Sequence, residues 1–400
     1  MEWKITNIGS LCNRVCSGGT PKSTNNAYYN GNIPWLNTKE VNFNRIYDTE
    51  KNITQLGLEN SSAKWISENS VIVAMYGATA GKVAITKIPI TTNQACCNLS
   101  INSEIADYNF VYYFLCSKFY ELSSLANGGA QQNLNAQIIK DFPIKIPVNL
   151  SDQRKIAGIL SALDSKIENN NKINANLEAQ AQALFKSWFV DFTPFKDQPF
   201  VDSELGPIPQ GWKVGKLGDY VEIKRGGSPR PIQKFLTSQG LNWLKISDAT
   251  STQSPFIFNI KEKIIINGLK KTVFLKAGSL VLSNSATPCI PKFLSIDSCI
   301  HDGWLYFPHS QLPKNYLYLF FKLMRNNLVS KANGSVFLNL KTDIVKNQVF
   351  AFSGEEIYNS FDKIIAPLFK EIENLTYETF QLSALRDTLL PKLMSGEIKL

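Results

Sequence analysis

The stretch IAGILSALDSKIENNNKINANLEAQAQALFKSW, residues 156–188, sets the architecture of this chain. From Ile156 to Trp188, apolar or uncharged side chains recur at alternating steps of four and three residues. This spacing keeps one stripe of side chains on a single helix face, as in helices that pack on one another. We call this stripe a seam. A second seam with the same spacing lies 205 residues later, from Phe361 to Leu393. Two seams in register predict two long helices that pack together. The seam positions expected to carry this packing are Ile156, Leu160, Leu163, Ile167, Leu177 and Leu184 in the first helix and Ile365, Leu368, Ile372, Leu375, Leu382 and Leu389 in the second.

The relation between the two seams extends over the whole chain, which has the pattern of a tandem repeat. The sextets SGGTPK (17–22) and RGGSPR (225–230) lie 208 residues apart, as do Trp35 and Trp243. The offset is 209 near the start and 205 near the end, and every match keeps its order. Ordered self-similarity of this length indicates a duplicated unit. We therefore expect a first domain over residues 1–150, a central helix over 151–190, a connector over 191–210, a second domain over 211–352 and a C-terminal helix over 353–396.

The expected fold class is mixed α/β, with two similar domains separated by the two long helices. Short β-rich runs such as 70–74 and 83–86 alternate with Gly, Asn and Pro turns. Residues 110–122 and 316–328 have the pattern of matching helices. The proline-rich connector 191–210 is expected to be extended.

The two helices are expected to form an antiparallel coiled coil, because a pseudo-two-fold axis crossing the pair would reverse one helix relative to the other. About 38 residues at about 1.5 Å each would make a rod of about 57 Å. The polar seam residues Asn170, Asn174, Thr379 and Arg386 would weaken the coil but fix its register. Pro367, inside the second seam, is expected to kink that helix or to mark its start.

The charge of the chain, +9 at pH 7, is concentrated in one segment. Residues 211–300 contain 13 Lys and Arg against 5 Asp and Glu. This excess fits a surface that faces a polyanion such as nucleic acid, although a lysine-rich solvated face would look the same.

The cysteines and the apolar pattern favour a cytoplasmic protein. Seven cysteines and two histidines, with no CxxC pair, are better explained by reduced thiols than by a zinc cluster. The first residues, MEWKITNIGS, have no signal-peptide pattern, and no run of 18 apolar residues occurs.

No catalytic motif accompanies this composition. The stretch GATAGKV, residues 77–83, has one residue too few between its glycines for a phosphate-cradling loop, and Val83 stands where Ser or Thr is needed. A turn between two strands, with Lys82 available to a DNA phosphate, is the preferred interpretation. His301 and His309 have no matching histidines in the first half. We expect no catalytic residue, cofactor or metal in this chain; a stand-alone enzyme with a diverged site is the rival interpretation.

The polar loops suit nucleic acid. They mix Lys and Arg, which bind guanine edges and phosphates, with Asn and Gln, which suit adenine. Ordinary solvated loops have a similar composition. In an alignment of the halves, Tyr76 stands opposite Asn284 and the pair Gln131-Gln132 opposite Phe337-Leu338, so each half is expected to recognise a different sequence. The candidate DNA-binding residues are Lys22, Asn37, Lys39, Tyr76, Lys82, Gln131 and Gln132 in the first half and Arg225, Arg230, Lys245, Asn284 and Lys292 in the second.

Three further stretches resemble the specificity subunits of type I restriction–modification systems. They are DQRKIA (152–157) with LFKSWFVDF (184–192), SELGPIPQGW (203–212), and LRD (385–387) with LLPKLMSGEI (389–398). The resemblance covers essentially the whole chain, although the first half lacks the Gly-Pro-x-Pro lead-in of the second.

The resemblance implies two target recognition domains that read a bipartite DNA site, with the helices fixing the gap. It implies double-stranded DNA, two methyltransferase subunits and two restriction subunits as partners, and S-adenosylmethionine, ATP and Mg in those subunits rather than in this chain. The methyltransferase is expected on the outer helix faces, near Ala157, Ala175 and Ala179. A modification-only methyltransferase subunit and a coiled-coil protein without a DNA role are the alternatives. The half-sites and the gap length are not deducible from the sequence.

Overall fold

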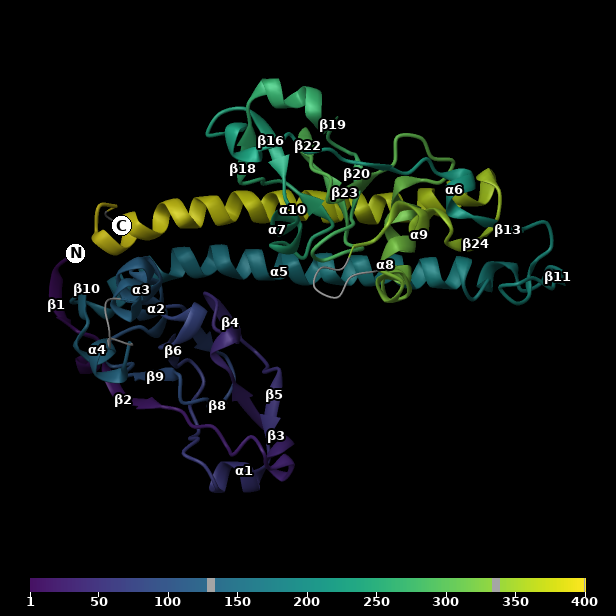
Figure 1. Ribbon diagram of the computed structural model, residues 1–400. Coiled ribbons are helices and arrows are strands. Elements are labelled where there is room, and N and C mark those ends of the chain that lie inside the picture. Colours follow the sequence, from purple (N-terminus) through teal and green to yellow (C-terminus); the bar gives the residue numbers. More distant parts are fainter. Residues whose placement is uncertain (128–133, 333–338, 399) are drawn as a thin grey trace. The chain divides into compact units, whose positions relative to one another are not determined.

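The computed structural model describes residues 1–127, 134–332, 339–398 and 400, which divide into two compact units. Unit 1 contains Met1–Lys166 and Leu382–Leu400, and unit 2 contains Ile167–Gln381. Each unit combines one α/β lobe with a part of both long helices, α5 (Leu150–Phe189) and α10 (Glu355–Ser395) (Figure 1).

The lobe of unit 1 is built on a five-stranded sheet in the order β2-β9-β6-β7-β4, with a three-stranded sheet β5-β3-β8 and a pair β1-β10. The strands are β1 (Trp3–Asn7), β2 (Cys12–Ser17), β3 (Tyr29–Leu36), β4 (Asn44–Ile46), β5 (Lys51–Ile53), β6 (Val71–Ala74), β7 (Val83–Thr86), β8 (Thr91–Thr92), β9 (Cys96–Ile101) and β10 (Pro143–Pro147). The helices are η1 (Ile8–Leu11), η2 (Asn26–Tyr28), η3 (Thr38–Glu40), α1 (Gln55–Glu59), η4 (Gly77–Thr79), α2 (Tyr108–Ser117), α3 (Phe119–Asn127) and α4 (Ala136–Asp141).

The lobe of unit 2 has a five-stranded sheet β14-β23-β20-β21-β17, a second sheet β15-β18-β16-β22-β19, and the pairs β13-β24 and β11-β12. The strands are β11 (Phe200–Val201), β12 (Ile208–Pro209), β13 (Lys213–Lys216), β14 (Lys224–Arg225), β15 (Leu236–Thr237), β16 (Leu241–Leu244), β17 (Phe256–Ile257), β18 (Glu262–Ile264), β19 (Val273–Leu275), β20 (Leu280–Ser283), β21 (Pro291–Leu294), β22 (Ser298–Ile300), β23 (Trp304–Tyr306) and β24 (Val349–Phe352). The helices are η5 (Thr193–Phe195), α6 (Leu217–Tyr220), η6 (Ile232–Lys234), α7 (Ile246–Thr250), η7 (Ile266–Lys271), α8 (Lys314–Ser330) and α9 (Thr342–Lys346).

The internal repeat is visible in the topology of the two lobes. The five-stranded order of the first lobe recurs strand for strand in the second, including the parallel edge pairs β4-β7 and β17-β21. The parallel pair β3-β8 likewise recurs as β16-β22. The duplication inferred from the sequence is therefore confirmed as a duplication of fold.

Buried strands at the centre of each main sheet separate two apolar clusters. In β6, Val71 and Val73 belong to the cluster that includes α2, whereas Ile72 and Ala74 belong to the cluster on the other face. Alternate residues of a strand point to opposite faces, so a strand covered on both sides must be apolar throughout. The sequence VIVA meets this requirement.

Within unit 1 the two long helices run antiparallel. Ile156 and Leu160, near the start of α5, share one buried cluster with Leu389 and Leu393, near the end of α10. The Arg386 guanidinium donates to the Asp164 carboxylate at 2.9 Å, and the Tyr113 hydroxyl donates to the same carboxylate at 2.6 Å. Asp164 therefore ties the lobe to the helix pair of its own unit.

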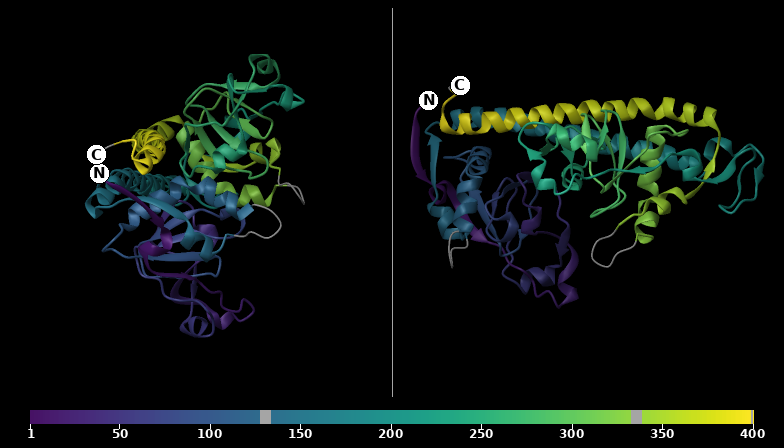
Figure 2. Two further views of the ribbon diagram at one scale, coloured as in Figure 1. Left: turned by 90° about the vertical axis from the view of Figure 1, so that its left-hand side faces the viewer. Right: turned by 45° about the horizontal axis from the view of Figure 1, so that its top comes forward.

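Within unit 2 the helices are again antiparallel (Figures 1 and 2). Aromatic rings dominate their contact. Phe361, near the start of α10, lies 6.1 Å from Phe185 and 5.5 Å from Trp188, near the end of α5, measured between ring centroids. Further along, the Asn170 amide donates to the Glu378 carboxylate at 2.8 Å. The antiparallel pairing expected from the seams is confirmed in each unit.

The seam residues take part in more than the helix pair. Leu177, Leu184, Ile365, Leu368 and Ile372 all join the core of the unit 2 lobe. The other five predicted seam residues, Leu163, Ile167, Leu375, Leu382 and Leu389, are buried or half-buried.

Several expectations about local structure are wrong. The helix expected over 110–122 breaks at Lys118 into α2 and α3, while α8 is continuous. Pro367 does not mark a helix start, because α10 begins at Glu355 and continues through this exposed position. Ala157 is only 2% exposed and belongs to the core of unit 1, so it is not on an outer face; Ala175 and Ala179 are exposed.

The connector is folded rather than extended. Its strands β11 and β12 pair as an antiparallel hairpin. Phe195, Ile208 and Trp212 form a small apolar cluster with Ala351, against which Trp188 of α5 packs. The chain leaves the long helix through Phe192, whose φ of 50° is left-handed, and the apolar side chains of the connector supply a core of their own.

Candidate nucleic-acid interface

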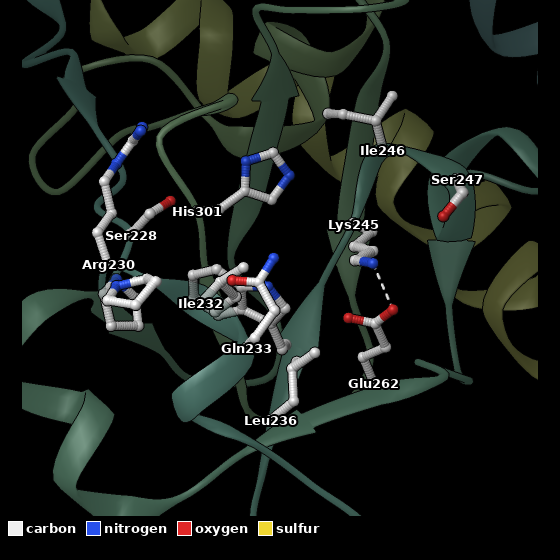
Figure 3. Close-up of a pocket in the computed structure, with 13 residues that line it drawn as sticks. Ser228, Arg230, Ile232, Gln233, Leu236, Lys245, Ile246, Ser247, Glu262 and His301 are labelled. Atoms are coloured by element: carbon white, nitrogen blue, oxygen red, sulfur yellow. Dashed lines mark hydrogen bonds and ion pairs between the residues drawn. The ribbon is translucent and has the colours of Figure 1, made fainter.

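The second lobe contains an open pocket of about 960 Å³ over the sheet β15-β18-β16-β22-β19 (Figure 3). The segment 228–233 and Leu236 line one part of it. Lys245 and Glu262 line another part, joined to each other by an ion pair. The volume lies in the range of ligand-binding pockets, and the lining combines charged, amide, imidazole and apolar groups.

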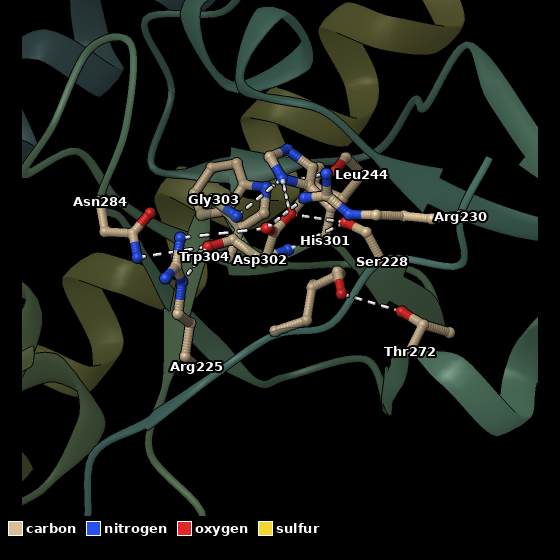
Figure 4. A network of polar contacts seen from close by, with 11 residues as sticks. Arg225, Ser228, Arg230, Leu244, Thr272, Asn284, His301, Asp302, Gly303 and Trp304 are labelled. Carbon is tan, nitrogen blue, oxygen red and sulfur yellow. Dashed lines mark hydrogen bonds and ion pairs between the residues drawn. The ribbon is translucent and has the colours of Figure 1, made fainter. Parts of the chain in front are cut away.

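A polar network centred on Asp302 lies at the pocket (Figure 4). The Ser228 hydroxyl donates to one carboxylate oxygen of Asp302 at 2.6 Å, and the Arg230 guanidinium donates to the other at 3.0 Å. Arg225 Nε donates to the main-chain carbonyl of Asp302. The hydrogen bond from Ser228, with the nearby charges of Arg225 and Arg230, holds the pKa of Asp302 below its ordinary value. Asp302 is therefore ionised at neutral pH and orients two guanidinium groups.

Arg230 is the most exposed member of this network. Its side chain is 79% exposed although one nitrogen is held by Asp302. A guanidinium has five N–H donors in a rigid plane, so the remaining donors face solvent in a fixed direction. This arrangement presents a planar donor group to the solvent outside the lobe.

His301 adds a neutral donor beside the network. Burial lowers the pKa of His301, while the neighbouring Asp302 opposes that shift. Its Nδ1 accepts a hydrogen bond from the Gly303 N–H at 2.8 Å. A neutral imidazole that accepts at Nδ1 carries its proton on Nε2, so Nε2–H is available as a donor.

Two glycines allow the network to form. The Gly226 N–H donates to the Trp304 carbonyl at 2.8 Å, and the Gly227 N–H to the Ile300 carbonyl at 3.3 Å. A Cβ at Gly226 would meet the His301 carbonyl oxygen far inside van der Waals contact. The chain can therefore pass this close to β22 only without a side chain, and the approach places Ser228 within reach of Asp302.

The first lobe repeats this loop with other side chains. The Gly18 N–H donates to the Cys96 carbonyl at 3.3 Å, and the Gly19 N–H to the Thr92 carbonyl at 2.8 Å. Thr20 then donates to the side chain of Gln94, as Ser228 does to Asp302. The backbone of the loop is conserved between the lobes, and the charge of the acceptor is not.

The structure places the other first-lobe candidates as follows. Lys22 and Tyr76 are exposed, and Lys39 pairs with Glu50. Asn37 caps η3, its side chain accepting from the Lys39 N–H, and Lys82 donates to Asn42 at 2.8 Å. GATAGKV forms the expected turn between β6 and β7. Gln131 and Gln132 lie outside the described residues.

Two second-lobe candidates are buried. Lys292 is 4% exposed and its ammonium donates to the carbonyls of Thr252 and Ser254. Asn284 is 2% exposed and its amide lies 3.4 Å from the Asp302 carbonyl. Neither side chain reaches the surface, so neither enters the interface proposed below.

Asn284 was predicted to be exposed because the alignment of the halves was wrong by one residue at this point. The Asn284 N–H donates to the Gly303 carbonyl, and in the first lobe the equivalent bond joins the Met75 N–H to the Ala95 carbonyl. Asn284 therefore corresponds to buried Met75 and not to exposed Tyr76.

Sequence reasoning missed Asp302, Ser228 and Glu262, which orient the predicted basic residues. An acidic residue beside an arginine predicted to bind DNA is not suggested by charge alone. The hydroxyl retained at Thr20 and Ser228 in both sextets was the one available signal.

Within the described part of the chain, no cluster of His, Cys, Asp and Glu is suited to a metal. The helices of that part include none with the length and apolar character to cross a membrane.

Comparison with known proteins identifies the fold and its family. Residues 1–179 and 209–380 both match the model of the type I restriction modification DNA specificity domain. The chain belongs to this family. The two matches coincide with the two halves of the repeat, so this specificity-domain chain carries the domain twice.

Relatives of the specificity-domain chain match along its whole length. It is 28% identical to the type I restriction enzyme MjaIX specificity subunit of Methanocaldococcus jannaschii, covering 100% of this chain and 94% of the relative. It is 23% identical to the HindI specificity subunit of Haemophilus influenzae, covering 99% and 100%. The crystal structure of a type I restriction–modification S subunit from M. genitalium has the same fold, with a TM-score of 0.61, 16% identity and coverage of 98% and 96%.

Proposed function

We propose that this specificity-domain chain reads a bipartite DNA site, one half-site per lobe. The observation that carries the proposal is the repeated lobe: a shared framework holds a polar surface loop in both copies, and the side chains on that loop differ. Two similar lobes whose surface loops carry different polar side chains suit two different DNA half-sites. Of the predicted residues, Lys22, Asn37, Lys39, Tyr76 and Lys82 of the first lobe and Arg225, Arg230 and Lys245 of the second remain in the proposed interface.

Catalysis belongs, in this proposal, to partner subunits. Two methyltransferase subunits would supply S-adenosylmethionine chemistry on adenine, and two restriction subunits would supply ATP- and Mg-dependent translocation and cleavage. The chain itself would be non-catalytic and cytoplasmic, where its DNA lies. The relatives named as specificity subunits of restriction enzymes support this division.

The test is to find the sequence that the chain selects. Cells carrying the gene with its methyltransferase partner should show methylated adenines in one asymmetric site made of two short half-sites and a constant gap. Selection of random duplexes by the purified complex should return the same site. A complex that binds DNA without sequence preference, or selects one contiguous site, would refute the proposal.

We further propose that the helix pair sets the gap. Duplicating one heptad in both helices, residues 160–166 in α5 and 375–381 in α10, adds about 10 Å to each. The gap should then widen by about 3 base pairs. Duplicating the heptad in α5 alone would leave the seams unmatched and should abolish site-specific methylation. An unchanged gap in the double insertion would show that the helices do not measure it.

A further inference from the structure

The lobes contain two sets of side chains at equivalent positions, and they differ in chemistry. We propose that these positions set which base each lobe reads, and that Arg230, braced by Asp302, reads a guanine in the half-site of the second lobe. The inference rests on the proposed function and names residues and a base for it. The paired positions are Lys22 with Arg230, Asn37 with Lys245, Lys51 with Glu262, Asn93 with His301, and Gln94 with Asp302.

Strand register, rather than sequence alignment, establishes these pairs. Trp35 is opposite Lys51 in β5 and Thr91 in β8. Trp243 is opposite Glu262 in β18 and Cys299 in β22. Counting two and three residues on from Thr91 and Cys299 pairs Asn93 with His301 and Gln94 with Asp302.

The loop hydrogen bonds fix the remaining pairs. Gly19 and Gly227 bond to the carbonyls of Thr92 and Ile300, which are themselves equivalent. Three residues further along each loop lie Lys22 and Arg230. Asn37 and Lys245 are the N-caps of η3 and α7, and in both the backbone N–H donates to an acidic side chain three residues later.

The difference between Gln94 and Asp302 determines what the exposed cation can do. Each accepts a hydrogen bond from the loop hydroxyl, but only Asp302 has a carboxylate with a second oxygen free for a guanidinium. In the first lobe, the residue that corresponds to Asp302 is Gln94, whose neutral amide provides no carboxylate oxygen for Lys22. The second lobe therefore presents the guanidinium of Arg230 as a fixed, planar pair of donors, called the fork below. The first lobe presents the ammonium of Lys22, a single charge on a flexible side chain.

Guanine is the base whose major-groove edge matches the fork. Its O6 and N7 are two acceptors side by side, and paired donors from one arginine satisfy both. A phosphate would be satisfied by any cation and would not need the orientation that Asp302 and Ser228 provide. The 79% exposure of Arg230 leaves its outer donors free of the lobe.

The experiment uses the full chain with its methyltransferase subunit and compares the selected half-sites of variants. Arg230→Lys keeps the charge and removes the fork. It should lower discrimination at one guanine of the second half-site by about 5- to 150-fold. The first half-site, the gap and binding to non-specific DNA should be unchanged. Asp302→Asn should relax the same position although Arg230 is still present. Lys22→Arg is the matched control in the other lobe and should leave the second half-site unchanged.

The outcomes separate the two proposals. If wild-type complex selects no bipartite site, the proposed function fails. If it selects one, but Arg230→Lys leaves the second half-site intact or weakens all sequences equally, the function stands and the guanine assignment is overturned. Because Arg230 is exposed, its variant should fold, which circular dichroism can verify. The double variant Lys22→Arg, Gln94→Asp tests the converse: it should introduce a guanine preference into the first half-site, and a half-site without one counts against the assignment.

Discussion

The two lobes share one strand framework and differ in the polar side chains that it carries. Their main sheets have the same strand order, and their glycine loops make the same two backbone hydrogen bonds. At the pocket rim, by contrast, the neutral Gln94 corresponds to the charged Asp302, and Lys51 to Glu262. A duplicated framework thus retains the glycines that make the loop possible and differs in the polar side chains around it. The helix pair differs too: its end in unit 1 is aliphatic, with Ile156 in the core, whereas its end in unit 2 is aromatic around Phe361.

Removing Phe361 should have the largest effect and tests the difference between the two helix ends. The ring is fully buried and packs against Phe185, Trp188 and Phe189. Phe361→Ala should lower the free energy of unfolding by about 3–5 kcal/mol, because it removes a large apolar group and leaves a cavity. Denaturant unfolding followed by near-UV circular dichroism, which reports on these rings, measures it.

The control compares equivalent positions in the two units. Ile156→Ala should cost about 2–5 kcal/mol, since it too removes a fully buried apolar side chain. Ile364→Ala, at a 45% exposed position of α10, should change stability by no more than about 0.5 kcal/mol. A Phe361→Ala variant as stable as Ile364→Ala would show that the aromatic end is not packed.

The parts of this fold that could be predicted from sequence are those with a long period. The heptad steps and the ordered repeat indicated both helices, their antiparallel pairing and the duplication, because many residues must agree for such a pattern to persist. Short-range features were less predictable. Nothing in the pattern over 110–122 indicates the break at Lys118, and one residue of drift in the repeat was enough to align exposed Tyr76 with buried Asn284.

The next largest effect is expected from Lys292, which should make the stability of the protein depend on pH. It corresponds to Ala84 of the first lobe, a buried alanine in the equivalent strand. Burial lowers the pKa of Lys292 from its ordinary 10.5 to about 8; Glu178 opposes this shift and Lys322 adds to it. Between pH 8 and 10.5 the unfolded chain holds this proton and the folded chain does not. Unfolding therefore takes up a proton, and stability gained from this group rises with pH through that window.

The measurement is a difference between two proteins, because buried cysteines titrate in the same range with the opposite sign. Burial raises the pKa of Cys97 to about 12, so its contribution to stability falls as pH rises. Relative to Lys292→Met, wild type should gain up to about 3 kcal/mol between pH 8 and 10.5. Lys261→Met, at an exposed lysine, should follow wild type. A difference that is flat with pH would mean that Lys292 stays charged in the folded lobe up to about pH 10.5, so that burial does not lower its pKa.

The candidate site was predictable in type but not in arrangement. Basic and amide residues on loops indicated nucleic acid, and Arg230 and Lys22 are exposed as expected. The sequence contains no sign that Lys292 turns inward to two carbonyls, or that Asp302, distant in sequence, holds Arg230. Those facts depend on which strands are neighbours, which composition does not encode.

The smallest effect on stability, and the sharpest test of the lobe comparison, comes from the loop glycines. A Cβ at Gly226 would collide with the His301 carbonyl, and one at Gly18 with the Thr92 carbonyl. Since both obstacles are backbone, each loop must move, and each alanine should cost about 1–3 kcal/mol. Gly158→Ala is the same chemical change at an exposed helix position with nothing within 4 Å, and it should stabilise the chain by up to about 1 kcal/mol.

The effect of the glycine variants on DNA recognition decides between two roles for the loops. If the loops read DNA, Gly226→Ala should relax the second half-site alone and Gly18→Ala the first alone. If the glycines serve only folding, both variants should weaken methylation of the whole site in proportion to the stability they lose, and the lobes would not be independent readers.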